Sequence, residues 1–445
     1  MNRLQLFAFI CGQIGMMTLT RYFFQWMIDF TSATRLENLP TTSSSAALFS
    51  ATTIGIVLLA FRIFDGVTDP IAGNWCDDWV RKGRDRTELL KYTAILPALG
   101  LVLCFAPSFD QSMWVRWALL LSGFFIFFVG YTVYAIPYWS LISDYSQSND
   151  TEIKDDQIET KLSNLLGLGL LIATAIGFLI SPILMDRFGF FGSACIFAVA
   201  CFFLMLMPYF GRKQVKLQIQ PQENQPALSA LLSTFKNRSF LGITLLFAGS
   251  QMSFTMMTSA APFIAVDLFH GKTSDVALLL GPLLFVALIF ALLFSQLNMS
   301  QYASPVKLLL ISSSALGLIY ALSSLLGTGI LENALGVSSL KLAMPLFALG
   351  GPFVAILLSL EGQMISKAAN ETGNGQIGIY FGSFNLLIKL LNGIAIAIAG
   401  YLGEWARSSG NELVIRYMNL TAGACLIFGG LMYLILKRST IKQSL

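Results

Sequence analysis

Residues 62–86 of the chain read RIFDGVTDPIAGNWCDDWVRKGRDR, a stretch that begins inside an apolar run and ends in a cluster of charges. Its first part holds Arg62, Asp65 and Asp69 where lipid is expected. At ~100° per residue, a helix places these three side chains within about 60° of one another. A charge at membrane depth costs about 2.5–3.5 kcal/mol, and such residues mark ion or substrate paths. The stretch therefore predicts a membrane helix that carries a functional site.

The composition places the whole chain in a membrane. Of its 445 residues, 55% are hydrophobic and 12% are charged, and the mean hydropathy is +0.70. About twelve apolar runs are long enough for the ~20 residues of a transmembrane helix. They cover approximately residues 4–28, 46–75, 92–108, 113–142, 162–185, 191–210, 241–266, 276–297, 308–327, 342–365, 377–402 and 414–436. The sequence thus predicts an all-α membrane protein with twelve transmembrane helices.

The basic residues indicate the orientation of these helices. With both termini in the cytoplasm, roughly eighteen Lys and Arg residues lie on that side and roughly seven on the other, as the positive-inside rule requires. The polar stretch 211–240 separates two sets of six runs. We therefore expect an N-terminal six-helix bundle over 1–210, a cytoplasmic central loop over 211–240 and a C-terminal six-helix bundle over 241–445. The expected location is the cell membrane, which is the inner membrane in a bacterium.

Asp65 and Asp69 have the chemistry of a cation site. Two carboxylates one helical turn apart can supply oxygen ligands to Na⁺ or share a proton. Lys389, in the eleventh run, balances the membrane charge together with Arg62. A cation that enters would compete with these two basic groups for the carboxylates. The alternatives are an Arg62–Asp65 pair that only pins helices together and a Lys389 that extends toward a membrane face.

The second part of the opening stretch is a short loop between the second and third runs. Gly73 would permit close helix approach, and Asp77 would cap or pair with a neighbouring helix end. Gly83 follows, and Arg84 and Arg86 would face the cytoplasm. An ordinary positive-inside loop is the alternative. The pattern resembles the loop signature of the major facilitator superfamily, in which such contacts hold one conformation.

Three motifs resemble one branch of that superfamily, the glycoside-pentoside-hexuronide cation symporters to which the melibiose permeases belong, and more distantly the lysolipid symporters. The motifs are RIFDGVTDPIAG (62–73), GYTVYAIPYWS (130–140) and GSFNLLIK (382–389). The resemblance implies a major facilitator fold of two six-helix bundles. It also implies cation-site positions at Asp65, Asp69 and Thr132, with Lys389 beside them and Trp139 near the sugar site.

The chain also departs from that branch. The fourth-span aspartate of the melibiose permeases falls on Ala135, and their first-span lysine and aspartate fall near Gln13 and Ile14. A sugar needs several buried polar partners, and two acids associated with its site are absent here. The solute is therefore first a sugar or glycoside, and second an amphiphile such as a lysolipid. The coupling ion is Na⁺ or H⁺.

Other residues of the apolar runs are candidates for a substrate cavity. Tyr131, Tyr134 and Trp139 could stack on a sugar, with packing as the alternative. Arg21 could bind an anionic group or anchor at the interface, and Glu361 could join a gate or reach the interface. Glycine and proline at 281–282 and at 350–352 predict bends in the eighth and tenth spans.

The sequence disfavours several other classes of function. His270 is the single histidine, so neither metal ligation nor histidine catalysis is expected. A Walker-type glycine loop is absent, which disfavours ATP-driven pumping, and the basic residues flank membrane runs, which disfavours nucleic acid. We therefore expect a monomeric symporter, not an enzyme, that needs no cofactor and works by alternating access. Its partners would be a small-molecule solute, a monovalent cation and the lipid bilayer; a non-transporting membrane assembly or receptor protein is the remaining alternative.

Overall fold

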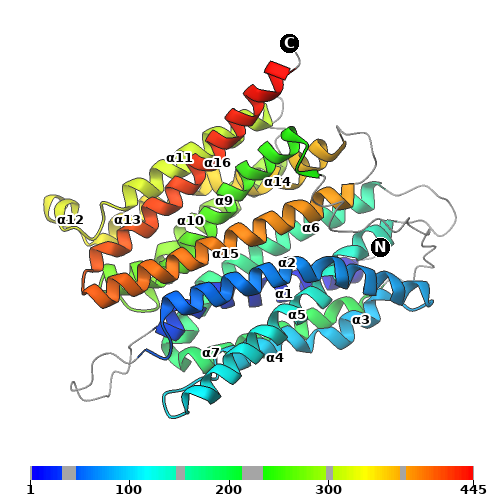
Figure 1. The fold of residues 1–445 in the computed structure, drawn as a ribbon, viewed down its shortest axis with the longest axis horizontal. Coiled ribbons are helices and arrows are strands. Elements are labelled where there is room, and N and C mark those ends of the chain that lie inside the picture. The colour runs from blue at the N-terminus through cyan, green and yellow to red at the C-terminus, as the bar shows by residue number, and fades with distance from the viewer. Residues whose placement is uncertain are drawn as a thin grey trace. The chain divides into compact units, whose positions relative to one another are not determined.

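The computed structural model describes residues 3–32, 47–146, 156–212, 234–296, 304–370 and 377–443. Every element in these ranges is a helix (Figure 1). This confirms the predicted all-α membrane class. The predicted central loop, 211–240, lies mostly outside the described residues.

The elements before the central loop follow the apolar runs. Asp85, which precedes the third helix, accepts a hydrogen bond from the Thr87 N–H at 2.8 Å and so caps that helix. The elements are α1 (Arg3–Ser32), α2 (Ala51–Arg81), α3 (Arg86–Thr93), α4 (Ile95–Cys104), α5 (Met113–Ser146), α6 (Asp156–Ala175), the π-helix η1 (Ile176–Ile180) and α7 (Ser181–Phe210).

The elements after the loop also follow the apolar runs, and side chains cap some of them. Asn237 and Ser304 accept backbone N–H bonds and cap the first and fourth of them. The elements are α9 (Arg238–Pro262), the π-helix η2 (Phe263–Leu268), α10 (Asp275–Gln296), α11 (Pro305–Ser323), α12 (Ile330–Leu335), α13 (Ser339–Ala348), α14 (Gly351–Asn370), α15 (Ile377–Ser409), the 3-10 helix η4 (Glu412–Ile415) and α16 (Arg416–Gln443).

The helices account for all twelve predicted spans. Among the described residues, ten helices are long and apolar enough to cross a membrane, and the bent pair α13–α14 makes an eleventh. One of the ten, Leu165–Phe210, has 46 residues. At 1.5 Å per residue this is about 69 Å, more than twice the ~30 Å apolar core of a bilayer. Gly189 interrupts this run with a φ of 68°, so the run supplies two of the predicted spans.

The structure shows a helix break at one of the two predicted bends. The tenth span breaks between α13 and α14, at Leu349 and Gly350, with an angle of 43°. The eighth span does not break, because α10 continues through Pro282. Membrane helices tolerate proline when neighbouring groups satisfy the freed backbone.

The contacts divide the chain into two compact units. Unit 1 comprises Met1–Phe23 and Val67–Asn224, and unit 2 comprises Phe24–Gly66 and Gln225–Leu445. The division therefore runs through α1 and α2, and residues 24–32 and 47–66 pack with the elements that follow the central loop. The boundaries predicted from the central loop assign residues 24–66 to the N-terminal half instead.

Each unit has its own core. In unit 1 the Phe23 ring stacks on Phe127 with centroids 4.4 Å apart. In unit 2, α16 lies along α9 and α11 (Figure 1). A Cβ on Gly249 of α9 would lie 3.0 Å from the Cα of Gly429, so glycines permit this close approach between membrane helices.

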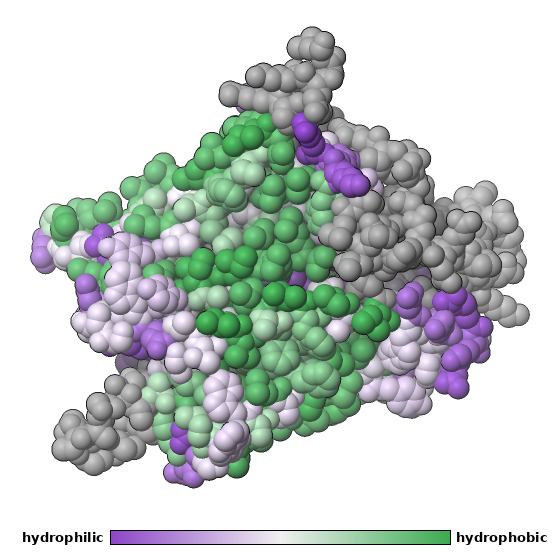
Figure 2. All heavy atoms as spheres, viewed as in Figure 1, coloured by the Kyte–Doolittle hydropathy of each residue, from purple (hydrophilic) through white to green (hydrophobic). Residues whose placement is uncertain are grey.

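Apolar side chains also cover much of the helix surface. Figure 2 shows them along the helices of the visible face, with polar residues toward the helix ends. Phe285 of α10 and Phe428 of α16 are 64% and 59% exposed. Such exposure suits helices whose solvent is lipid.

Candidate functional site

α2 carries the two predicted aspartates, Asp65 and Asp69, one helical turn apart, and the two residues belong to different compact units. Asp65 belongs to unit 2 and Asp69 belongs to unit 1. The predicted cation site thus lies on a helix that contributes to both units.

Asp65 is completely buried and pairs with two basic side chains. Its Oδ2 lies 3.1 Å from Nη1 of Arg62 on the same helix and 3.1 Å from Nζ of Lys389 on α15. The Lys389 ammonium also donates to the Asp65 carbonyl oxygen at 3.4 Å. The three charges predicted from the sequence therefore come together. Lys389 does not extend to a membrane face, since its side chain is only 12% exposed.

Small residues bring α2 and α15 close enough for this contact. A Cβ on Gly55 would lie 2.9 Å from the Cα of Ala397, and a Cβ on Gly393 would lie 3.1 Å from the Cβ of Arg62. Contacts under about 3.4 Å leave no room for a side chain at either glycine. Larger residues would push α2 away and separate Asp65 from Lys389.

Arg62 also packs on an aromatic ring. Its guanidinium carbon lies 4.4 Å from the centroid of Phe24, within unit 2. Such a cation–π contact stabilises a guanidinium away from water. Arg62 is therefore fixed by its own helix, by Phe24 and by Asp65.

Asp69 lies beside Thr132, the third predicted member of the cation site. Thr132 is 1% exposed, and its Oγ1 donates to Oδ1 of Asp69 at 3.4 Å, a long distance for such a bond. A shallow, half-open pocket of about 180 Å³ between α2 and α5 adjoins Thr132, and its lining includes Ile71 and Trp75, which are 65% and 42% exposed. The carboxylate and hydroxyl oxygens are the hard ligands that suit Na⁺, and the carboxylate alone can take up a proton.

The predicted aromatic cluster divides into a packing residue and two substrate candidates. Tyr134 is fully buried, and its hydroxyl donates to the Met205 carbonyl at 2.7 Å, so Tyr134 packs inside unit 1. Tyr131 and Trp139 meet edge to face, with centroids 6.4 Å apart. The Trp139 indole N–H donates to Oε1 of Gln13 at 3.3 Å.

Arg21 and Glu361 each form a hydrogen bond with another helix of their own unit. Nε of Arg21 donates to Oγ1 of Thr174 at 3.3 Å, and a Cβ on Gly177 would lie 2.6 Å from the Arg21 Cβ. Oε2 of Glu361 accepts from Nε2 of Gln251 at 2.8 Å. Arg21 is thus held by the α6–η1 segment, and Glu361 is held by α9.

The loop between α2 and α3 contains two differences from expectation. Arg86 was expected to face the cytoplasm; it is 8% exposed and pairs with Oδ1 of Asp144 at 2.6 Å. A Cβ on Gly73 would meet no described atom within 4 Å, so the expected close helix approach is not found there. The first difference arises because Arg86 begins α3, which packs on α5, and because Asp144 lies in α5.

The other loop residues have local roles. Gly83 has a φ of 76°, the left-handed region that glycine enters without strain. Arg84 is exposed, with its guanidinium 4.4 Å from the Trp79 ring centroid. The side chain of Asp77 lies outside the described part of the chain.

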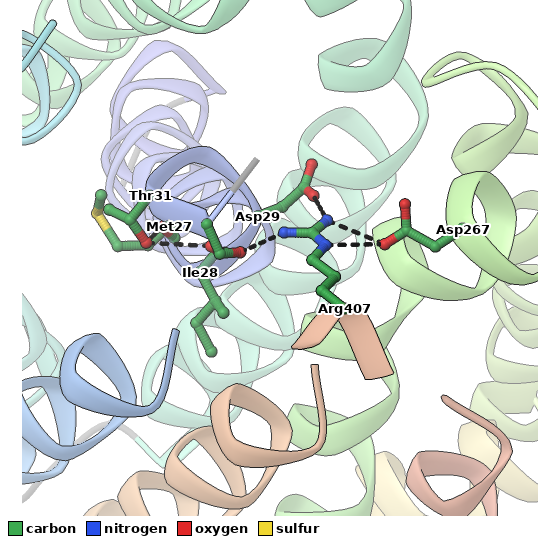
Figure 3. Close-up of polar contacts among 7 residues, drawn as sticks. Met27, Ile28, Asp29, Thr31, Asp267 and Arg407 are labelled. Carbon is green, nitrogen blue, oxygen red and sulfur yellow. Dashed lines mark hydrogen bonds and ion pairs between the residues drawn. The ribbon is translucent and has the colours of Figure 1, made fainter. Parts of the chain in front are cut away.

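Sequence reasoning missed the charges at span ends. Besides Asp144, these are Asp29, Asp267 and Arg407, which form a cluster in unit 2 (Figure 3). Asp29 lies one residue beyond the first predicted run, and Arg407 five residues beyond the eleventh, so both resembled flanking residues. One signal in the sequence could have found this cluster. Its three charges follow the first, seventh and eleventh predicted spans, and these odd-numbered spans all end on the same side of a membrane.

Comparisons with known proteins identify the family. The model of the MFS/sugar transport protein family matches residues 44–408. The POT family transporter PepTSo has a similar structure, with a TM-score of 0.68 and 12% identity over 100% of this chain and 99% of that chain. The nucleoside transporter NupG has a TM-score of 0.64 and 12% identity over 98% of this chain and 100% of that chain. At such identities these structures show a shared fold alone, and no curated protein matches the chain. Because the family model spans most of the chain, this protein belongs to the MFS/sugar transport protein family of the major facilitator superfamily, and it is an integral, multi-pass membrane transporter and not an enzyme.

Proposed function

We propose that the protein is a cation-coupled solute symporter of the melibiose-permease-like branch. The observation that carries the proposal is the completely buried Asp65 carboxylate, 3.1 Å from both Arg62 and Lys389. Charges within membrane helices are costly and mark ion paths. A carboxylate with only a structural role would need one basic partner to balance its charge. Asp65 has a second partner, Lys389 on α15, so its charge state affects the contact between α2 and α15.

The proposed coupling is a competition for carboxylate oxygens. Na⁺ or H⁺ binds at Asp65 and Asp69, with Thr132 as a further ligand, and Lys389 and Arg62 compensate the carboxylates when the cation has left. A cation that replaces Lys389 at Asp65 weakens the contact between α2 and α15. Ion occupancy thereby changes the relative free energies of two conformations, which is what coupling requires.

The proposed solute is a sugar or glycoside. Tyr131 and Trp139 supply ring faces, and Gln13 supplies an amide beside the Trp139 indole. Aromatic faces with a polar neighbour suit a sugar ring and its hydroxyls. A lysolipid or another amphiphile is the second candidate, favoured by the apolar lining of the half-open pocket beside Thr132.

The test is uptake by the purified protein in proteoliposomes. A panel of labelled sugars, glycosides and lysolipids is supplied under an imposed Na⁺ or H⁺ gradient. We expect gradient-driven accumulation of one solute by the wild type. Asp65→Asn and Asp69→Asn should each abolish accumulation, because an amide cannot balance a bound cation. The matched control is Arg81→Gln, since the Arg81–Asp78 pair is half exposed and should not affect transport.

The outcomes separate the parts of the proposal. Unchanged accumulation in both asparagine variants would exclude coupling at α2. Downhill exchange that persists in Asp65→Asn while accumulation is lost would support coupling at this residue. Failure of the folded protein to move any solute of the panel, with either gradient, would exclude both proposed solute classes.

A further inference from the structure

Two basic side chains of unit 1 meet at one tyrosine ring. Nζ of Lys91, in the last turn of α3, lies 5.2 Å from the ring centroid of Tyr209 in the last turn of α7. The guanidinium carbon of Arg212, which follows α7, lies 4.9 Å from the same centroid. Such cation–π contacts hold a cation in place without neutralising its charge. The ring therefore brings two positive charges together where α3 packs on α7.

Carboxylates do not compensate these two charges in the described part of the chain. The contacts of Lys91 and Arg212 there are with tyrosine rings, and neither side chain forms an ion pair. Arg86 at the start of α3 differs in this respect, since it pairs with Asp144. Two like charges repel each other, so an anion close to both lowers their electrostatic free energy. The two cations thus have the charge of an anion-binding site.

Exposed aromatic side chains adjoin both cations. Tyr92, the next residue after Lys91, is 63% exposed, and its ring centroid lies 5.6 Å from Nζ of Lys91. Phe210, two residues before Arg212, is 72% exposed. Aromatic residues at the ends of membrane helices typically lie at the level of the lipid headgroups. The two cations therefore lie where headgroups meet acyl chains.

The start of α1 extends this apolar surface. A Cβ on Gly211 would collide with the Cβ of Ala8 and would lie 3.6 Å from the Leu4 carbonyl oxygen, so the end of α7 packs closely on α1. Leu4 and Phe7 of α1 are 68% and 60% exposed. The exposed Arg3 comes directly before them. Positive charge thus borders an apolar surface that three helices share.

We propose that Lys91, Tyr209 and Arg212 form a lipid site, which binds the phosphate of an anionic phospholipid whose acyl chains lie along the adjoining apolar surface. Basic pockets between membrane helices bind such headgroups. Two cations suit a headgroup with a net negative charge, as in phosphatidylglycerol, better than one whose own ammonium group balances its phosphate. Free inorganic phosphate has the same oxygens but lacks chains that could cover the exposed aromatic residues.

The lipid site does not depend on the proposed transport mechanism. It is formed by α3 and by the end of α7, whereas Asp69 and Thr132 of the proposed cation site lie on α2 and α5. A bound phospholipid would connect α3 to the end of α7 through its phosphate. We therefore expect the lipid to act as a stabilising ligand of unit 1.

The experiment measures lipid binding by the purified, delipidated full chain in a nonionic detergent. Phosphatidylglycerol and phosphatidylcholine with the same acyl chains are titrated separately. The unfolding temperature reports binding, since a ligand that binds only the folded state stabilises it. We expect phosphatidylglycerol to bind at least tenfold more tightly than phosphatidylcholine. High salt should weaken this preference, because exposed charges are screened.

The test variant is Lys91→Gln combined with Arg212→Gln. Its affinity for phosphatidylglycerol should fall at least tenfold, while its affinity for phosphatidylcholine should not change. Lys91 is exposed and Arg212 is half-buried, and each single variant serves as the test if the double variant does not fold. Lys91→Arg keeps the charge and should retain the preference.

Two further variants control the interpretation. Arg81→Gln combined with Lys82→Gln removes the same net charge from the exposed end of α2 and the loop that leads to α3, and it should keep the preference. Tyr209→Leu keeps both cations but removes the ring that positions them. It should weaken the binding of phosphatidylglycerol, a result that attraction by net charge alone does not predict.

The outcomes decide between a site and a general attraction. Loss of the preference in the Lys91 and Arg212 variant, with the preference kept in the Arg81 and Lys82 variant, supports the lipid site whether or not the protein transports any solute of the panel. An equal loss in both variants would overturn the site, because net charge would then explain the binding. Equal stabilisation by inorganic phosphate and by phosphatidylglycerol would overturn the assignment to a lipid.

Discussion

The Asp65 carboxylate forms ion pairs with two basic groups, one on its own helix and one on another helix. Arg62 lies on the same helix three residues earlier, so this pair persists wherever α2 moves. Lys389 lies on α15, so its pair exists only while α15 contacts α2. In the proposed coupling, Lys389 is therefore the partner through which a bound cation influences helix contacts.

Replacing Lys389 tests this distinction. Lys389→Met keeps the length of the side chain and removes the competing ammonium. We expect a higher apparent cation affinity and a loss of solute accumulation, because the cation no longer displaces an interhelical partner. Cation-dependent thermal stabilisation measures the affinity, since a ligand that binds only the folded state stabilises it. Lys82→Met, in the exposed loop after α2, is the control, and an affinity equal to wild type in Lys389→Met would contradict the competition.

Arg86 and Arg81 provide a matched pair for the effect of burial. Arg86 and Asp144 are 9% and 7% exposed as side chains, whereas Arg81 and Asp78 are 50% and 60% exposed. Removing one partner of a buried pair costs about 3–5 kcal/mol, and an exposed pair contributes about 0–1 kcal/mol. Arg86→Gln should therefore lower the unfolding temperature of the purified protein clearly, and Arg81→Gln should barely change it. Equal shifts would show that Asp144 does not depend on Arg86.

At the scale of elements, the close approach of α2 to α15 depends on glycines. A Cβ on Gly400 of α15 would come too close to the Ala51 carbonyl oxygen, and a Cβ on Gly73 would meet no described atom within 4 Å. Both glycines lie inside helices. We expect Gly400→Ala to destabilise the protein because the helices must separate. Gly73→Ala should stabilise it by about 0.5–1 kcal/mol, the helical preference for alanine. Thermal unfolding of both variants checks the opposite signs, and shifts of the same sign would contradict the close contact.

Apolar length predicted the spans well, because a bilayer sets the number of residues that each helix needs. The break between α13 and α14 followed from Gly350 and its neighbours, since glycine and proline weaken a helix locally. Pro282 carried a similar signal without breaking α10, because packing decides whether a helix bends there.

The candidate site was predictable only where charges interrupt an apolar run. Asp65 and Lys389 stand out in the sequence for this reason, and the structure pairs them. Arg407 and Asp144 do not stand out, because a charge at the end of a run resembles an ordinary loop residue. Their burial depends on contacts between distant helices, to which no local pattern in the sequence corresponds.

At the scale of the whole molecule, the end of α1 (residues 24–32) and residues 47–66, which include the first part of α2, pack with the helices that follow the central loop. Among the described residues, their ionic connections in unit 2 include the Asp65–Lys389 pair and the Asp29–Arg407 pair. In the proposed coupling, the cation acts directly on the first of these pairs. It can shift the conformational equilibrium only by the difference in its affinity for the two conformations, so the Asp29–Arg407 pair must be weak enough for that difference to overcome it.

We expect the described residues 24–32 and 47–66 to move as one body. Asp65→Asn then weakens the same contact with α9 and α15 as Arg407→Gln, although Ser259 bonds to Phe24 and not to Asp65. The rate at which a water-soluble maleimide labels the buried cysteine of Ser259→Cys should rise in each variant, and the logarithms of the two increases should add in the double variant, as they do for independent contributions to one equilibrium. Measuring the four rates under one condition gives this sum directly. An unchanged rate in Asp65→Asn would mean that the centre and the end of the segment open separately, and the coupling cation would then have to act on the Asp29–Arg407 pair through another route.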